Sequence, residues 1–276
     1  VIENKSMIFK LNKFLILLVC FLASLNLMSE ESLEVKNEYK PVVNEIVEIL
    51  DQNHFKKNIV INERKVIDNF LINLDKEKIV FTSVEFNSYK ASFKNIYNLE
   101  EIFKIYQDYS DRTLELIGYQ KEVVDLIDTS ADLNTTEFVE KSREDKKRFN
   151  SLDSIKNYHA LLIKNEFINI LLSNDNFKNS KSKLLKRLKN RVKSLKRIKS
   201  DDIFSLYINS ITTLYDPHTN YLSPKSQEDF EINMSLSLEG IGAILSTEDG
   251  ITKIVRLIPG GPADKSGLLK VNDKIV

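Results

Sequence analysis

A glycine-rich turn near residue 240 could bind a carboxylate through its backbone. Gly240, Ile241, Gly242 and Ala243 stand directly before an apolar run that ends at Leu245. Glycine allows a sharp turn, and such a turn can expose consecutive N–H groups to one anion. An extended segment after the turn can pair with an incoming peptide. The order of turn and strand predicts a site for the free C-terminus of a polypeptide, although the glycine spacing alone is also typical of a hairpin turn.

The residues that follow predict the scaffold of this site. Glu248 to Gly250 is typical of a turn, and Ile251 to Ile258 is typical of a second strand. Pro262 suits the first turn of a short helix, which Gly267 would end. We expect another strand to begin in Leu268 to Val276.

These motifs resemble the PDZ domain of C-terminal-processing (tail-specific) proteases. The resemblance is carried by GIGA (240–243), GGPADKSGL (260–268) and NDKIV (272–276). DPHTNYLSP (216–224) resembles the segment that precedes the PDZ domain in the Prc-type branch, and residues 234–242 extend the match without a gap. Further upstream the resemblance is carried by Leu74-Asp75 and by residues 79–82.

The resemblance implies a periplasmic serine-type endopeptidase that trims or degrades proteins from the C-terminus. In this family the PDZ domain binds the substrate tail, and a separate domain cuts with a serine nucleophile and a lysine that desolvation keeps neutral. Both catalytic residues follow the PDZ domain in the family, so we assign none here and expect this fragment to be inactive by itself. The alternative is a non-catalytic exported PDZ protein that binds peptides or acts as a scaffold.

The resemblance also implies a set of peptide-binding residues. They are Leu238, Gly240, Ile241, Gly242, Ala243, Ile244 and Leu245. In this set Ile241 and Ala243 would line the pocket for the last substrate side chain. Asn272 stands where the family usually has glycine, and because asparagine tolerates positive φ we expect the turn to survive. The implied partners are C-terminal tails of protein substrates, together with a lipoprotein adaptor that no residue here identifies.

The N-terminal residues are typical of an export signal. Residues 1–6 precede the expected start at Met7, and residues 7–29 combine basic residues with an apolar run from Phe14 to Leu22. We predict export to the periplasm, with an inner-membrane anchor if the signal peptide is not cleaved. Cys20, the only cysteine, lies in this segment, so the mature chain would form no disulfide.

Apolar residues recur with a helical period from Glu34 to about Leu214, and we expect this range to be nearly all helix. Asn62 is placed to cap one helix, and Thr82 with Glu85 forms a capping-box pattern that opens another. A later helix near Ser154 would direct these residues inward: Ile155, Tyr158, Leu161, Leu162 and Ile168.

The sequence therefore predicts an α+β fold class with two domains. A mainly helical N-terminal domain would span residues 34–226, and a partial, truncated PDZ domain rich in β-structure would span residues 227–276. The first strands are expected after about Ser235, where helical periodicity gives way to short apolar runs. The chain is 42% hydrophobic and 29% charged with a net charge of +0, as in ordinary folded proteins.

Residues 177–200 contain eleven lysines and arginines and no acidic residue. A basic helix could bind nucleic acid or an anionic membrane surface. The same segment carries an apolar stripe that includes Leu185, Leu188, Val192 and Leu195, which favours an amphipathic helix with a solvated basic face. We expect no nucleic-acid partner and only weak contact with a membrane surface.

No cofactor-binding motif is present, so we expect no cofactor. His218 is far in sequence from His54 and His159, and no metal-ligand spacing links the three histidines. We therefore expect no metal site, and we expect His218 to fix the turn after Asp216 by hydrogen bonding.

Overall fold

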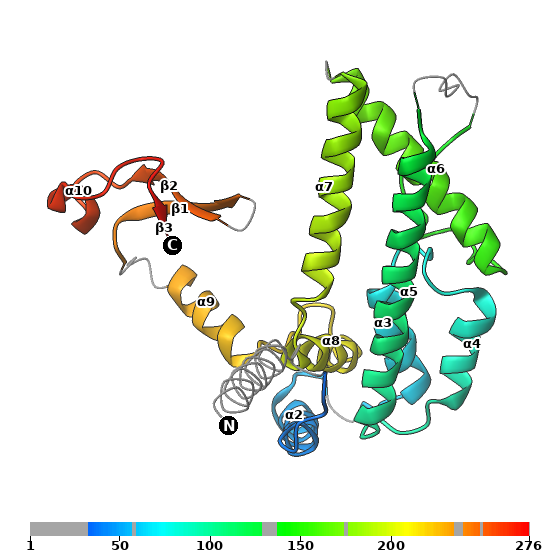
Figure 1. Ribbon diagram of the computed structural model, residues 1–276. Helices are drawn as coiled ribbons and strands as arrows, with labels where there is room; N and C mark the ends of the chain where they lie inside the picture. Colours follow the sequence, from blue (N-terminus) through cyan, green and yellow to red (C-terminus); the bar gives the residue numbers. More distant parts are fainter. Residues whose placement is uncertain are drawn as a thin grey trace, which may run out of the picture. The chain divides into compact units, whose positions relative to one another are not determined.

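The computed structural model describes residues 33–56, 59–128, 137–173, 176–234, 240–248 and 251–275. The predicted signal peptide, residues 7–29, lies outside these ranges. The chain divides into two units, of which unit 1 ends at Tyr221 and unit 2 begins at Leu222 (Figure 1). Each unit is described by itself.

Unit 1 is built from helices in the part that the structure describes. They are α2 (Tyr39–Asn53), α3 (Glu63–Leu74), α4 (Ser83–Ser92), α5 (Leu99–Leu126), α6 (Leu152–Leu172), α7 (Phe177–Leu195) and α8 (Ser200–Thr212). The predicted helical character of this region is confirmed.

The predicted caps fix where two of these helices begin. The side chain of Asn62 accepts a hydrogen bond from the backbone N–H of Lys65 at the start of α3. At α4, Thr82 Oγ1 accepts from Glu85 N–H while the Glu85 carboxylate accepts from Thr82 N–H. These hydrogen bonds confirm both predicted caps. Such caps can be predicted from sequence because they depend only on residues a few positions apart.

Two large hydrophobic clusters and a smaller third one hold the described part of unit 1 together. Helices α2, α3 and α8 pack with the first half of α5 around one cluster, in which Phe70, Leu99 and Tyr207 are fully buried. The second half of α5 packs with α6 and α7 around another cluster, centred on Phe167 and Leu184 (Figure 1). Helix α5 therefore joins the two clusters.

The buried face of α6 differs from the predicted one. The buried side chains are Ile155, His159, Ile163, Phe167 and Ile170, whereas Tyr158, Leu161, Leu162 and Ile168 are only half-buried. The inward stripe includes a histidine, which an apolar pattern does not reveal. His159 can be buried because both ring nitrogens have hydrogen-bond partners. Nε2 contacts the carbonyl oxygen of Ile79 at 2.9 Å, and Nδ1 contacts Gln120 Nε2 at 3.0 Å.

A buried ion pair organises the turn after α3. The Asp75 carboxylate accepts hydrogen bonds from the backbone N–H groups of Ile79 (2.9 Å) and Phe81 (3.0 Å). Arg148 forms an ion pair with the same carboxylate, and the two side chains are 7% and 1% exposed. Because a buried carboxylate is costly without such partners, this contact fixes the segment before α6 against the end of α3.

Unit 2 contains α9 (Pro224–Met234), α10 (Pro262–Ser266) and a small antiparallel sheet. Strands β1 (Ala243–Glu248), β2 (Ile251–Leu257) and β3 (Lys274–Ile275) lie in the order β1-β2-β3. The third strand is much shorter than the predicted segment, because a turn at Asn272 precedes it. The helical region followed by a small sheet confirms the predicted α+β fold class.

The predicted turn residues of unit 2 take the expected backbone conformations. Pro262 is the first residue of α10, and Gly267 ends that helix with a φ of 66°. Asn272 has a φ of 75°, which confirms that asparagine supports the turn in place of glycine. Ile254 of β2 and Ala263 of α10 are the buried hydrophobic residues among the described part of this unit.

Candidate peptide-binding site

The outer edge of β1 is open in the described part of unit 2. Strand β1 lies at the end of the sheet order and pairs only with β2 there. Ile244 and Leu245 on this strand are 41% and 43% exposed, and the pairing register shifts between them. An open edge with exposed apolar side chains can accept an additional strand.

The loop before β1 is anchored by its carbonyl groups. The carbonyl oxygen of Ile241 accepts a hydrogen bond of 2.8 Å from Ala263 N–H, at the start of α10. The carbonyl oxygen of Gly242 accepts another of 2.8 Å from Ile258 N–H, just beyond β2. These two bonds fix the orientation of the peptide units on either side of Gly242.

That orientation directs N–H groups to the open side. No cis peptide bond occurs in the described chain, so the C=O and N–H of one peptide unit point in opposite directions. The N–H of Gly242 therefore points away from α10, and the N–H of Ala243 points away from β2. Adjacent N–H groups in such a turn can bind one carboxylate, and the carbonyl contacts direct these two away from α10 and away from β2.

Gly242 and Gly240 play different roles in the loop. Gly242 has a φ of +74°, and a Cβ added there would lie 3.0 Å from both Gly261 Cα and Pro262 Cδ. At Gly240 an added Cβ would meet no atom within 4 Å. Only Gly242 is therefore required by its backbone conformation and by the close approach of the Gly261–Pro262 backbone.

The structure brings most of the predicted residues to this edge. Ile241 is 50% exposed beside the loop, and Ala243 is half-buried at the first position of β1. Leu238 lies outside the described residues.

The sequence did not single out Arg256, which pairs directly with Ile244 in the sheet register and is exposed. Directly opposite side chains share a face, so alternation along β2 was the signal that could have identified this cation.

The basic helix α7 uses several cations inside unit 1. Arg187 and Arg191 form ion pairs of 3.1 Å and 2.7 Å with Glu166 of α6. Lys181 Nζ donates to the carbonyl oxygens of Asp125 (2.9 Å) and Ile127 (3.0 Å), at the C-terminal end of α5. Part of the basic character of α7 therefore stabilises its packing.

The buried stripe of α7 is formed mainly by Ser180, Leu184 and Leu188. Leu185 and Val192, which the sequence placed in the stripe, are half-buried at its side. The predicted amphipathic helix is present, with its stripe shifted by a fraction of a turn.

The histidines do not form a metal site in the described chain. No group of three or more His, Cys, Asp or Glu side chains there could hold a metal ion. The turn at His218 is held by its backbone N–H, which donates to Asp216 Oδ1 at 2.8 Å. His54, distant in sequence, contacts Thr219 Oγ1 through Nε2 at 3.2 Å.

Among the described helices, none is long and apolar enough to cross a bilayer.

Comparison with known proteins places these features in context. Residues 46–225 match the family model described as the tail-specific protease N-terminal domain. The tail-specific protease of Haemophilus influenzae is 31% identical over 236 residues, which cover 82% of this chain and 34% of that protein. The carboxy-terminal processing protease CtpA of Bacillus subtilis is 39% identical over 72 residues, which cover 24% of this chain and 16% of that protein. The chain spans 34% of the length of the Haemophilus protein.

Proposed function

This chain belongs to the tail-specific protease family, and we propose that the whole protein is a serine-type endopeptidase that recognises the free C-terminus of its protein substrates. In this proposal the substrate tail adds as a strand to the open edge of β1. Residues 240–245 bind the tail, with Leu238 just before them. Hydrolysis is carried out by a serine nucleophile and a neutral lysine that lie outside residues 1–276.

The orientation of the N–H groups of Gly242 and Ala243 is the observation that carries this proposal. The two anchoring bonds of 2.8 Å hold the loop carbonyls against Ala263 and Ile258, which supports the proposal because the N–H groups of the same peptide units then point away from these contacts. Preorganised donors lower the cost of binding. Hydrogen bonds to a charged group contribute about 1.5–3 kcal/mol each. A free carboxylate is thus favoured over a neutral amide.

Arg256 adds a long-range contribution to the same preference. Its guanidinium group is exposed on the face that carries Ile244. An exposed cation on this face attracts a carboxylate, but solvent screening limits the contribution to about 1 kcal/mol or less. Arg256 therefore assists the backbone donors and does not replace them.

The proposed cellular location follows from the sequence of residues 7–29, which combine lysines with an apolar run. We propose export to the periplasm, where the substrates and a lipoprotein adaptor would be met. The exposed lysines of α7, such as Lys178, Lys189 and Lys193, would permit a weak, salt-sensitive contact with an anionic membrane surface.

The test is the binding of a labelled peptide with an apolar C-terminus to a protein that contains the complete PDZ domain. Fluorescence anisotropy would compare the free acid with the C-terminal amide. We expect the amide to bind at least about tenfold more weakly, since at least one charge-assisted bond is lost. Lys189→Ala, on α7 of unit 1, serves as the control and should leave both affinities unchanged.

Equal affinity for the two peptides would show that the loop is an ordinary turn. Binding with the expected preference but without cleavage of the peptide by the complete protein would instead support the alternative, a non-catalytic exported peptide-binding or scaffold protein.

A further inference from the structure

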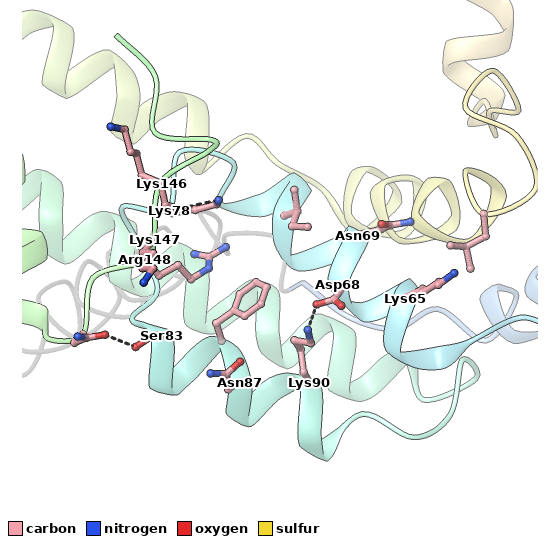
Figure 2. Close-up of a pocket in the computed structure, with 14 residues that line it drawn as sticks. Lys65, Asp68, Asn69, Lys78, Ser83, Asn87, Lys90, Lys146, Lys147 and Arg148 are labelled. Carbon is pink, nitrogen blue, oxygen red and sulfur yellow. Dashed lines mark hydrogen bonds and ion pairs between the residues drawn. The ribbon is translucent and has the colours of Figure 1, made fainter. Parts of the chain in front are cut away.

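A depression of ≈ 810 Å³ on unit 1 is lined by fourteen residues, of which six are cationic (Figure 2). This basic pocket is formed by α3, α4 and the segment before α6. The cationic residues are Lys65, Lys78, Lys90, Lys146, Lys147 and Arg148. Asp68 is the only acidic side chain among the described residues that line it. The volume of the basic pocket falls within the range of ordinary ligand sites.

Part of this positive charge is compensated within the protein. The ion pairs are Lys90 with Asp68 at 2.6 Å, Lys146 with Glu140 at 2.9 Å, and Arg148 with the buried Asp75. These pairs hold the walls of the pocket together, as Figure 2 shows for Lys90 and Asp68 across α4 and α3.

The remaining charge is not compensated. Lys65 and Lys147 are exposed and form no ion pair with an acid in the described chain. Lys78 Nζ donates to the carbonyl oxygens of Lys146 (2.9 Å) and Glu144, which are neutral groups. Its ammonium group is therefore fixed in position, and these carbonyl partners do not compensate a positive charge. A concave surface with an excess of one sign concentrates the field of its charges.

Amide and apolar groups lie between these cations. Ser83 Oγ donates to Asn150 Oδ1 at 2.8 Å, which leaves the amide NH₂ of Asn150 as a donor. Asn87 adds a second amide from α4, and the half-buried Phe86 gives an apolar surface beneath the Arg148 guanidinium, 4.0 Å from the ring centroid. A bare inorganic anion would leave the apolar surface unused, whereas amides together with an aromatic surface also suit peptide groups and aliphatic stems.

We propose that the basic pocket binds an acidic segment of a polypeptide. Carboxylate side chains would pair with Lys65, Lys78 and Lys147, while the backbone of the segment would bond to the amides of Asn87 and Asn150. The pocket belongs to unit 1 and shares no residue with the edge of β1. The proposal therefore does not rest on the proposed function.

The probe is a fluorescein-labelled peptide rich in Asp and Glu whose C-terminus is amidated, so that it carries no terminal carboxylate. The matched peptide has Asn and Gln at the same positions. Anisotropy is measured with the purified chain at salt concentrations between about 0.05 and 0.5 M, over which the screening length shortens severalfold. We expect saturable binding of the acidic peptide that weakens with salt, and binding of the neutral peptide that is at least about tenfold weaker.

Substitutions separate the pocket from general attraction to basic surface. Lys65→Glu combined with Lys147→Glu should weaken binding of the acidic peptide at least about tenfold. Lys189→Glu combined with Lys193→Glu on α7 makes the same change in net charge and should weaken it less than about twofold. Lys65→Arg with Lys147→Arg should retain binding. All four lysines are exposed, and thermal unfolding would verify that the variants fold equally well.

Three results would overturn the proposal. If the double variant in the pocket and the double variant on α7 lost the same affinity for the acidic peptide, binding would be unspecific charge attraction. Equal binding of the acidic and neutral peptides would remove the role of carboxylates. Displacement of the acidic peptide by inorganic phosphate at equimolar charge would assign the pocket to small anions instead.

Discussion

Replacement of Gly242 by alanine should open the loop before β1. The residue has a φ of +74°, and an alanine in the left-handed region costs about 1–2 kcal/mol. The new Cβ would lie 3.0 Å from Gly261 Cα and Pro262 Cδ. Those atoms belong to backbone and to a proline ring, so they cannot rotate away, and such overpacking costs about 1–3 kcal/mol. The expected total is about 2–5 kcal/mol for the local structure.

Hydrogen exchange measures this loss where it occurs. The N–H groups of Ile258 and Ala263 donate to the carbonyl oxygens of Gly242 and Ile241 at 2.8 Å. Their exchange reports the free energy of local opening. Because about 1.4 kcal/mol corresponds to a factor of ten, both amides should exchange at least about tenfold faster in the Gly242→Ala variant. Binding of a free C-terminus should weaken in parallel.

Gly240→Ala is the matched control, because an added Cβ there meets no atom within 4 Å. This variant should leave the exchange of Ile258 and Ala263 unchanged. Unchanged exchange in Gly242→Ala, or equal acceleration in both variants, would refute the argument that conformation and close approach make Gly242 necessary.

Three further predictions concern unit 1 and the activity of the chain. Arg148→Met should lower the free energy of unfolding by about 3–5 kcal/mol, since it leaves the buried Asp75 carboxylate without its cation. Urea denaturation would measure this loss, with Lys104→Met, which breaks an exposed ion pair, as the control. A loss in Arg148→Met no larger than in the control would contradict the prediction. Burial lowers the pKa of His159 from its usual 6.5, so the unfolded chain binds more protons below that pH and stability should fall as pH decreases through 6.5. Between about pH 7.5 and 5.5 the loss of unfolding free energy should reach at most about 1.4 kcal/mol. Urea midpoints measured over this range should show the loss in the native chain but not in His159→Gln. The same pH dependence of the midpoint in both proteins would exclude His159 as its cause. The purified chain should not cleave an unstructured protein, and cleavage that is abolished by a substitution within residues 1–276 would disprove this.

The sequence by itself determined the features that depend on near neighbours. Asn62 and the Thr82–Glu85 pair placed the starts of two helices, because capping bonds join residues three positions apart. Pro262 and Gly267 likewise marked the ends of α10. The candidate loop was predictable for the same reason, since glycine spacing and the following apolar run are local signals.

Only the tertiary structure decided how distant residues meet. It showed that Gly242, and not Gly240, is confined by the Gly261–Pro262 backbone, and that the sheet order leaves β1 at an edge. These facts depend on packing between segments, which no local pattern encodes.

The same distinction holds for charge in unit 1. Asp75 meets Arg148, 73 positions away, and the basic pocket combines Lys65 of α3 with Lys147 before α6. The sequence drew attention to the basic segment 177–200 because its charges are contiguous. The cations of the pocket are dispersed along the chain, and only the packing of α3, α4 and the segment before α6 brings them into one concave surface.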